Sequence, residues 1–372
     1  MTKNYSGRVN ALKARRQGLN VPKEIEKSLA TNVIALDSYV KDSYRLFEQE
    51  EYETRTNSAA LIYALGAMQQ VDEKYTSISF DEAKRVSSQV ITELAKLGES
   101  ATAELQGSLL LNVHLRRTSD VDLLILPESF CVYSSLGVGA HRYTPSDIRK
   151  SDKILQLREN CFDILKRVYY AARVDNSGAK CITMTGGSLK RDVDIVPAIW
   201  FDGEDYQTSL NKTDRGVMIY DRFDKSFSTN YPFKVKSKID YKDIVTSGGC
   251  KKVIRLLKTL KTDTEIDIQL SSFDIMSIVF AMENRMLSHQ RSYEGLLILS
   301  IRDWLSYLIS NPAVLRSLSV IDGSRKIITS KDSEEGVISL FQELKELVEK
   351  IGEELAPYDY QRRPNVLKES IP

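Results

Sequence analysis

The stretch that decides the fold is QGSLLLNVHLRRTSDVDLLIL, residues 106–126. It opens on a Gly-Ser pair and ends in an apolar run that follows two aspartates, Asp120 and Asp122. Alternation that passes into a continuous apolar run predicts a buried strand. Residues two apart on a strand face the same side, so these carboxylates lie side by side and raise each other's pKa. A divalent ion such as Mg²⁺ relieves that repulsion, because it takes carboxylate oxygens as ligands.

A second acidic pair, Asp192 and Asp194, lies on RDVDIVPAIW, residues 191–200. If this strand neighbours the first, three carboxylates can converge. Two metal ions about 4 Å apart need such a cluster to support in-line phosphoryl transfer. A single D-x-D at a strand end is better explained as a chance, solvated pair. Two of them, each followed by an apolar strand, favour a metal site.

Gly107 and Ser108 stand thirteen and twelve residues before Asp120, with an apolar helical turn between. Glycine lets the backbone approach a phosphate closely, and the serine adds a hydroxyl and an N–H group. A lone Gly-Ser pair is common, so its position upstream of the aspartates carries the interpretation. The sequence has no G-x-x-x-x-G-K-[ST] motif, which excludes a P-loop enzyme.

Taken together, these motifs resemble the signature of the polymerase-β-like nucleotidyltransferases. The form D-h-h-P-A at residues 194–198 is similar to the subgroup that holds 2′-5′ oligoadenylate synthetases, cyclic GMP–AMP synthase and the bacterial cyclic-oligonucleotide synthases, or CD-NTases. This resemblance implies that Asp120, Asp122 and Asp194 are catalytic residues and ligands of two Mg²⁺ or Mn²⁺ ions. Asp192 is then an extra acid on the same face.

Two further segments add to the resemblance. In CKKVIRLLKTL, residues 250–260, Lys251, Arg255 and Lys258 share one helical face. A solvated cationic face explains this spacing, but the segment also resembles the V-[IV]-R-L-x-K helix of bacterial synthases, which implies that Lys258 contacts a triphosphate. In LSSFDIMSIVFAM, residues 270–282, we expect Ser272 to cap a helix. The Ser-Ser-aromatic cluster resembles that of cyclic GMP–AMP synthase, which implies that Ser272 binds phosphate and Phe273 stacks on a base.

The fold class that follows is α+β and bilobal, with a polymerase-β-like mixed sheet flanked by helices and an α-helical C-terminal lobe. We expect three regions: a helical N-terminal region over residues 1–98, the nucleotidyltransferase core over 99–240, and a helical nucleotide-binding domain over 241–372. The sequence also predicts individual elements along the chain. They are a frayed N-terminus over 1–20, an apolar helical stripe from Pro22 to Val40, helices over 58–70, 80–98 (capped by Asp81 and closed by Gly98) and 146–172, strands over 181–185 and 191–200, an irregular segment over 216–239, helices from Tyr241 to Leu355, and an irregular tail.

Composition narrows the function. Hydrophobic residues make up 42% and charged residues 28%, and 52 basic residues stand against 51 acidic ones, which gives a formal net charge of +1. This balance disfavours a stable nucleic-acid partner. The four cysteines and three histidines are scattered, which disfavours a zinc site and a disulfide framework. Without a signal-like or membrane-length apolar run, we expect a cytoplasmic protein with no membrane partner.

The preferred hypothesis is a metal-dependent enzyme that joins nucleoside triphosphates into a cyclic di- or trinucleotide second messenger and releases pyrophosphate. Its substrates are ATP and one or more of GTP, CTP and UTP, and its partner is a downstream effector that recognises the product in bacterial anti-phage (antiviral) signalling. Two alternatives remain open. One is a transferase of the same superfamily that adds nucleotides to an RNA end or to a protein, and the other is a non-catalytic nucleotide-binding module.

Overall fold

A computed structural model describes residues 3–17, 49–116 and 118–371 of the chain. The predicted helical stripe from Pro22 to Val40 lies outside these residues. By internal contacts the chain divides into two compact units. The sheet unit comprises Asp72–His114 and Thr118–Lys238, and the helical unit comprises Met1–Val71, Leu115–Arg117 and Ile239–Pro372.

The sheet unit contains eight strands and the helices that cover them. Its strands are β1 (Ala101–Gln106), β2 (Val121–Pro127), β3 (Cys131–Tyr133), β4 (Arg173–Asp175), β5 (Ile182–Thr185), β6 (Val193–Asp202), β7 (Gly216–Asp221) and β8 (Ser226–Asn230). Its α-helices are α6 (Glu73–Lys96), α7 (Gly107–Leu110), α8 (Lys150–Val168) and α9 (Glu204–Ser209), and its 3-10 turns are Ala140–Arg142 and Lys212–Asp214.

The strands form one mixed sheet with β6 at its centre. The main order is β1-β2-β6-β5-β4, and the second half of β6 pairs instead with β3 and β7, which leads on to β8. The β2–β6 and β3–β6 pairs are parallel, and the other pairs are antiparallel. This mixed sheet confirms the α+β fold class that the sequence predicted.

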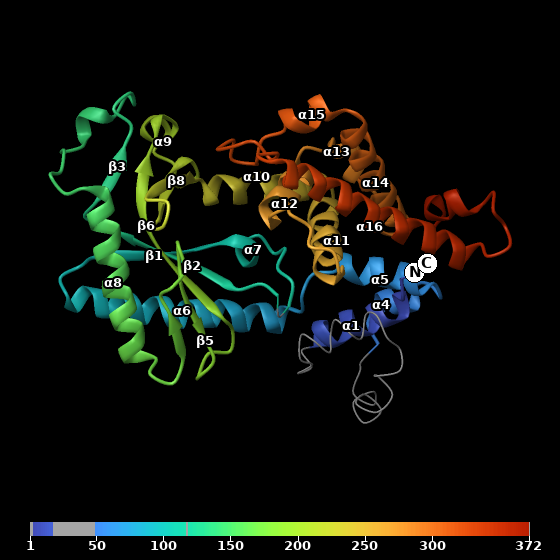
Figure 1. Ribbon diagram of the computed structural model, residues 1–372, viewed down its shortest axis with the longest axis horizontal. Coiled ribbons are helices and arrows are strands. Elements are labelled where there is room, and N and C mark those ends of the chain that lie inside the picture. The colour runs from blue at the N-terminus through green and yellow to red at the C-terminus, as the bar shows by residue number, and fades with distance from the viewer. Residues whose placement is uncertain (1–2, 18–48, 117, 372) are drawn as a thin grey trace. The chain divides into compact units, whose positions relative to one another are not determined.

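Helices α6 and α8 pack on one face of the sheet, as Figure 1 shows. Under them lies an apolar cluster that includes Val121 and Leu123 of β2 and Val193 and Ile195 of β6. The alternate residues of the same strands, such as Leu124 and Val196, belong to a second cluster on the other face. The two faces of β2 and β6 are therefore both apolar in their centre, and polar side chains are confined to the strand ends.

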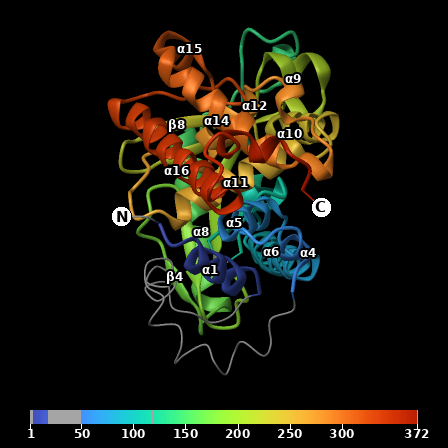
Figure 2. The ribbon, with the colours of Figure 1, turned by 90° about the vertical axis from the view of Figure 1, so that its right-hand side faces the viewer.

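The helical unit carries the helices on either side of the sheet unit in the sequence. Those helices are α1 (Tyr5–Gln17), α4 (Glu51–Thr54), α5 (Ala59–Met68), α10 (Pro232–Val245, in which the boundary falls), α11 (Gly249–Asp263), α12 (Ser272–Phe280), α13 (Asn284–Leu287), α14 (Gly295–Ser310), α15 (Pro312–Ser317) and α16 (Lys331–Leu355), with 3-10 turns at Arg291–Tyr293 and Arg363–Lys368. Helix α5 is buried nearly all round by α1, α11 and α16 (Figure 2). None of the described helices is long and apolar enough to cross a bilayer.

Some local predictions hold and others are wrong. Gly98 follows α6 in a left-handed conformation, as predicted, and the helix predicted over residues 58–70 is α5, with Ser58 accepting a hydrogen bond from Leu61 N as its cap. Helix α6 begins much earlier than predicted, because Asp72 is its cap and Asp81 lies inside it. Residues 5–17 form a helix rather than a frayed end.

The segment 216–239, predicted to be irregular, is instead a β-hairpin followed by a helix. Strands β7 and β8 pair over Val217–Asp221 and Ser226–Asn230, and α10 starts at Pro232. Asp221 Oδ1 accepts hydrogen bonds from the backbone N–H groups of Phe223 and Asp224, so residues 222–225 form the turn of the hairpin. The tail also contains a 3-10 turn at Arg363–Lys368, where no regular structure was predicted.

The compact units divide the chain at places other than those named from the sequence. The sequence predicted boundaries near residues 98 and 240, whereas α6 groups with the sheet and residues before 72 group with the C-terminal helices. Helix α6 joins the sheet because its buried side chains Val86, Val90 and Leu94 share the apolar cluster under β1 and β2. The functional roles given to the three regions stay predictions.

Candidate active site

Two of the predicted carboxylates come from adjacent strands of the sheet unit. In the parallel β2–β6 pair, Asp122 stands opposite Asp194. Neighbouring strands lie about 4.8 Å apart, so opposite residues share one face of the sheet at close range. This face is the one turned away from α6 and α8, because Val121, Leu123 and Val193 point toward those helices. Both aspartates are half-buried, so each is desolvated in part and still reachable.

Asp194 is held by a hydrogen bond from the next strand. Thr183 on β5 is its register partner, and Thr183 Oγ1 donates to Asp194 Oδ1 at 2.7 Å. A hydrogen bond to a carboxylate orients it and satisfies one of its lone pairs. Burial and the nearby charge of Asp194 raise the pKa of the Cys181 thiol, whose sulfur lies 3.8 Å from Thr183 Oγ1. Sequence reasoning missed Thr183, because nothing in CITMT shows which residue it faces.

Asp122 lies against the glycine of the Gly-Ser pair. Gln106 is the register partner of Asp122, and the chain turns at Gly107 with a φ of +76°. A Cβ built on Gly107 would lie 2.1 Å from Asp122 Oδ2, far inside van der Waals contact. Only glycine fits here for two reasons, the left-handed backbone and the space that the carboxylate already takes.

Ser108 follows in the short helix α7, where its side chain is half-buried and its carbonyl accepts a hydrogen bond from Val113 N at 3.0 Å. This bond closes the turn predicted between the Gly-Ser pair and the aspartates. Asn112 sits in that turn with a φ of +53°, a conformation that asparagine tolerates better than most residues. Gly107, Ser108 and Asp122 therefore form one local unit.

Asp120 lies just before β2 and is exposed. Asp192 is exposed just before β6, and its backbone carbonyl accepts a hydrogen bond from Val121 N at 3.1 Å. This bond holds the two acidic segments side by side at the strand ends. The four oxygen-rich side chains at this edge match the ligand preference of Mg²⁺ or Mn²⁺. Within the described residues, no three acidic, histidine or cysteine side chains already meet in a metal-binding arrangement.

The predicted nucleotide contacts of the C-terminal part lie in the helical unit. Arg255 and Lys258 are only 6% and 7% exposed, so a solvated cationic face does not explain the spacing of Lys251, Arg255 and Lys258. Arg255 Nε donates to the Met68 carbonyl at 2.8 Å, and Lys251 Nζ pairs with Asp240 Oδ1 at 2.6 Å. Burial lowers the pKa of Arg255 to about 10. The helix is thus packed on both faces.

The cap of α12 is Ser271 rather than the predicted Ser272. Ser271 Oγ accepts from Asp274 N at 3.1 Å, and Asp274 Oδ2 accepts from Ser271 N at 3.0 Å, which makes a reciprocal capping box. Ser272 is therefore the first helical residue and is exposed, with the half-buried Phe273 beside it. Ser272, which was predicted to bind phosphate, is therefore not the serine that caps the helix.

The site lies on a mixed sheet. A Gly-Ser turn lies against Asp122 on one strand, and Asp194 lies on the parallel neighbouring strand. This combination defines the class of polymerase-β-like nucleotidyltransferases. Comparison with known proteins agrees. No protein-family model matches the chain. The cyclic dinucleotide synthase CdnE of Yersinia aleksiciae is 35% identical over 364 residues, which cover 96% of this chain and 95% of that protein.

Two further similarities point the same way. A c-di-GMP synthase of Lachnospiraceae bacterium strain RUG226 is 31% identical over 242 residues, or 59% of this chain and 68% of that protein. The structure of a STING-associated CdnE c-di-GMP synthase from Capnocytophaga granulosa matches with a TM-score of 0.68 and 26% identity, covering 93% of this chain and 97% of that one.

The chain belongs to the CD-NTase family of bacterial cyclic-oligonucleotide synthases. It is a nucleotidyltransferase that joins nucleoside triphosphates into a cyclic nucleotide signal with release of pyrophosphate, as the sequence predicted. Enzymes of this class depend on a divalent metal.

Proposed function

We propose that this protein is a cyclic dinucleotide synthase whose chemistry is performed at the edge of β2 and β6 by Asp120, Asp122 and Asp194. The observation that carries the proposal is the register that sets Asp122 opposite Asp194 on one face of the sheet. Thr183 donates a hydrogen bond to Asp194, and Gly107 leaves the space that the Asp122 carboxylate takes. Such reinforcement is typical of metal ligands, whose orientation depends on the groups behind them.

The reaction is an in-line displacement at phosphorus. A ribose hydroxyl of one nucleotide attacks the α-phosphate of another, the bond to the leaving pyrophosphate breaks, and a second round closes the ring. Two Mg²⁺ or Mn²⁺ ions held by the three aspartates would lower the pKa of the hydroxyl and neutralise the charge on the triphosphate. The chain itself supplies the fixed carboxylates and the turn at Gly107-Ser108 that binds phosphate.

The remaining contacts are assigned by the family resemblance. Lys258 and Ser272 bind the triphosphate, and Phe273 stacks on a base, which contributes about 1–3 kcal/mol per base without strong base preference. The burial of Lys258 supports a role that needs a desolvated charge, because Coulomb attraction is stronger away from water. The exposure of Ser272 leaves its hydroxyl accessible to a ligand.

The proposed product is a cyclic dinucleotide, and this choice is supported by the names of the relatives described above, all of which are cyclic dinucleotide synthases. Two of them are c-di-GMP synthases, so GTP alone is the first substrate to test. The product serves a downstream effector in anti-phage defence, and the enzyme acts in the cytoplasm, where nucleoside triphosphates are available.

The test is product analysis by mass spectrometry with all four triphosphates and with each alone, in Mg²⁺ and in Mn²⁺. A phosphatase-resistant cyclic dinucleotide is expected. A label that enters only added RNA or the protein itself would instead support the terminal-transferase alternative and refute cyclisation.

Variants connect the product to the proposed site. Asp194→Asn should abolish product, whereas Asp192→Asn should retain most of it, because only Asp194 lies on β6 opposite Asp122. Both variants remove one negative charge from the same short segment, so they are matched in charge and position. Equal loss in the two variants would show that the third ligand has been assigned incorrectly.

A further inference from the structure

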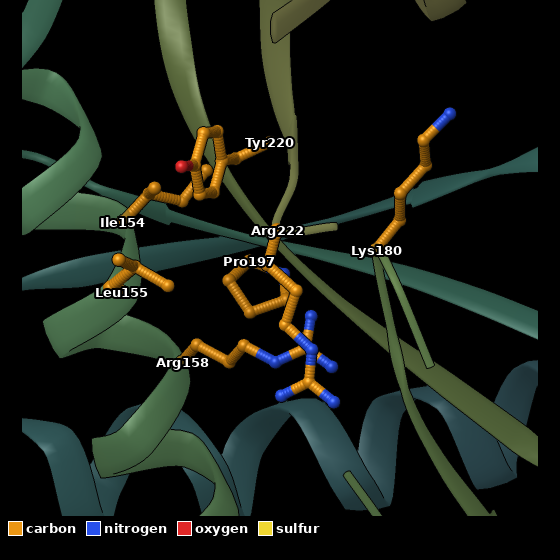
Figure 3. Close-up of a pocket in the computed structure, with 7 residues that line it drawn as sticks. All are labelled: Ile154, Leu155, Arg158, Lys180, Pro197, Tyr220 and Arg222. Carbon is orange, nitrogen blue, oxygen red and sulfur yellow. The ribbon is translucent and has the colours of Figure 1, made fainter. Parts of the chain in front are cut away.

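A small pocket lies in the sheet unit away from the proposed active site. It has a cavity volume of about 10 Å³ and is walled by α8, by the segment before β5, and by the centre of β6 and the end of β7 (Figure 3). The lining residues are Ile154, Leu155, Arg158, Lys180, Pro197, Tyr220 and Arg222. Four of these residues are apolar or aromatic, and the three charged ones are all cations.

The pocket opens on the opposite face of the sheet from the catalytic carboxylates. Pro197 is three residues after Asp194 on β6, and an odd spacing along a strand reverses the face. The α8 residues Ile154 and Arg158 line the pocket, and α8 covers the face away from Asp194. A ligand in this pocket would therefore leave the acidic edge of β2 and β6 untouched.

Two guanidinium groups come together on one side of the pocket. Arg158 Nη2 donates to the Asn176 carbonyl at 3.4 Å, and Arg222 Nη2 donates to the same oxygen. Arg158 is 4% exposed and also donates to the carbonyls of Gly178 and Cys181, at 2.8 and 2.7 Å. Burial, and then the neighbouring charge of Arg222, lower the pKa of Arg158. Like charges of this kind repel, and an anion between or beside them would relieve the repulsion.

Arg222 retains unused hydrogen-bonding capacity. Its Nε is buried and has no hydrogen-bond partner. A buried donor without an acceptor costs about 1–3 kcal/mol, so a ligand that accepts from it recovers that free energy. Arg222 is placed firmly, since its backbone N–H donates to the Ala179 carbonyl at 3.2 Å. The Nε–H group is thus an unsatisfied donor on a residue that lines the pocket.

The carboxylates near these cations are Asp175, whose charge acts on Arg222, Glu159, whose charge acts on Arg158, and Asp221 beside Lys180. Asp221 Oδ2 lies 3.8 Å from Lys180 Nζ, at the limit of an ion pair, while Asp221 Oδ1 accepts from the Phe223 and Asp224 N–H groups of the hairpin turn. Lys180 is largely exposed and its ammonium points away from the two guanidiniums in Figure 3. A flexible lysine can swing toward an anion, because its stem has four rotatable carbons.

We propose that this pocket is a second ligand site that binds the phosphate group of a small molecule. Arg222 and Lys180 hold the phosphate oxygens, and Arg158 is a positioning residue that fixes the segment 176–181 through its carbonyls. Arginine is suited to this role because its planar fork matches phosphate oxygens. The small volume admits about one water-sized group, so one oxygen of the phosphate enters it and the remainder of the ligand lies over Tyr220 or in solvent.

The experiment is an NMR titration of the full-length protein, following the arginine Nε–H resonances in EDTA so that metal-dependent nucleotide binding does not contribute. Inorganic phosphate and GMP are the two probes. A saturable shift of the Arg222 resonance with both supports a phosphate site, and tighter binding of GMP shows that the ligand extends beyond the phosphate. An Arg222 resonance that either probe leaves unmoved at millimolar concentration would overturn the proposal.

Variants locate the effect without disturbing the fold. Arg222→Gln and Lys180→Gln should each weaken binding about tenfold or more, since each removes a charge-assisted hydrogen bond. The Arg158 Nε–H resonance, which every variant keeps, reports binding in this comparison. Arg173→Gln is the matched control, because Arg173 is an exposed arginine of the same unit outside the pocket. Arg158 is left intact, as its carbonyl contacts hold a loop. Equal weakening in Arg173→Gln and Arg222→Gln would mean that general surface charge, and not this pocket, attracts the phosphate.

Discussion

Replacing Gly107 with alanine perturbs the proposed active site through a single methyl group. The added Cβ would lie 2.1 Å from Asp122 Oδ2 and 3.1 Å from its carboxyl carbon, where ordinary contact begins at 3.4 Å. The obstacle is the carboxylate itself, so the carboxylate must move by about 1 Å, a misplacement that can cost on the order of 100-fold in rate. We expect Gly107→Ala to lower kcat about 100-fold.

The backbone cost of this change must be separated from its effect on the carboxylate. Gly107 has a φ of +76°, and a left-handed conformation costs a residue with a Cβ roughly 1–2 kcal/mol. Gly98 offers a matched control, because its φ is +77° and nothing lies within 4 Å of a Cβ built there. Gly98→Ala should therefore share the loss of stability but keep its activity.

The assay is the rate of pyrophosphate release from GTP and ATP, combined with thermal unfolding of both variants. We expect similar melting temperatures for Gly107→Ala and Gly98→Ala and rates that differ about 100-fold. If the two variants had rates within threefold of each other, the close approach of Gly107 to Asp122 would have no catalytic importance, and the reasoning would be refuted.

Three further predictions follow from the site and from the helical unit. Thr183→Val should lower kcat about 10- to 100-fold, since a hydrogen bond to a charged group is worth about 1.5–3 kcal/mol, and Thr183→Ser should restore most of it; equal rates in the two variants would dismiss orientation of Asp194 by the hydroxyl. Chelation of divalent ions should abolish product formation and added Mn²⁺ or Mg²⁺ should restore it, whereas activity that persists in EDTA would contradict a metal-dependent reaction. Burial alone would raise the pKa of Glu343, but the hydrogen bond from Lys3 and the charge of Arg8 lower it. The contribution of Glu343 to the free energy of unfolding is therefore present above the unfolded pKa of about 4.3 and is lost as the pH falls through the lower folded pKa. Urea unfolding of wild type and Glu343→Gln from pH 6 to pH 3 should show a steeper loss of stability in the wild type, and parallel curves would exclude this linkage.

The predictions that rested on local pattern were the most reliable. The acidic pairs at residues 120–122 and 192–194 and the apolar runs after them specify two strands with carboxylates at their ends, because side-chain alternation is a property of the strand itself. Gly98 likewise marks a helix end through a backbone conformation that involves only neighbouring residues. Two other local predictions were wrong, since Asp72 rather than Asp81 caps α6 and Ser271 rather than Ser272 caps α12.

The errors arose where distant residues decide the structure. The N-terminal segment looked frayed because it is basic, but Arg15 pairs with Asp263 at 2.6 Å and Arg8 with Glu343 at 3.3 Å, and these partners stabilise α1. The spacing of the cations also allowed a solvated Arg255, but Arg255 Nε is buried and donates to the Met68 carbonyl. A charge can be buried only where a partner satisfies it, and the partner's place depends on the packing of the chain.

The sequence by itself determined the class of enzyme, since Gly107, Ser108 and the aspartates stand within short segments whose spacing is read directly. Only the tertiary structure decided which of these groups face one another. The register of β2 against β6 sets Asp122 opposite Asp194, and the register of β5 brings Thr183 to the same carboxylate. Register is set by how strands from separate parts of the chain pack together, and a shift by one residue would turn the whole acidic face toward α6 and α8.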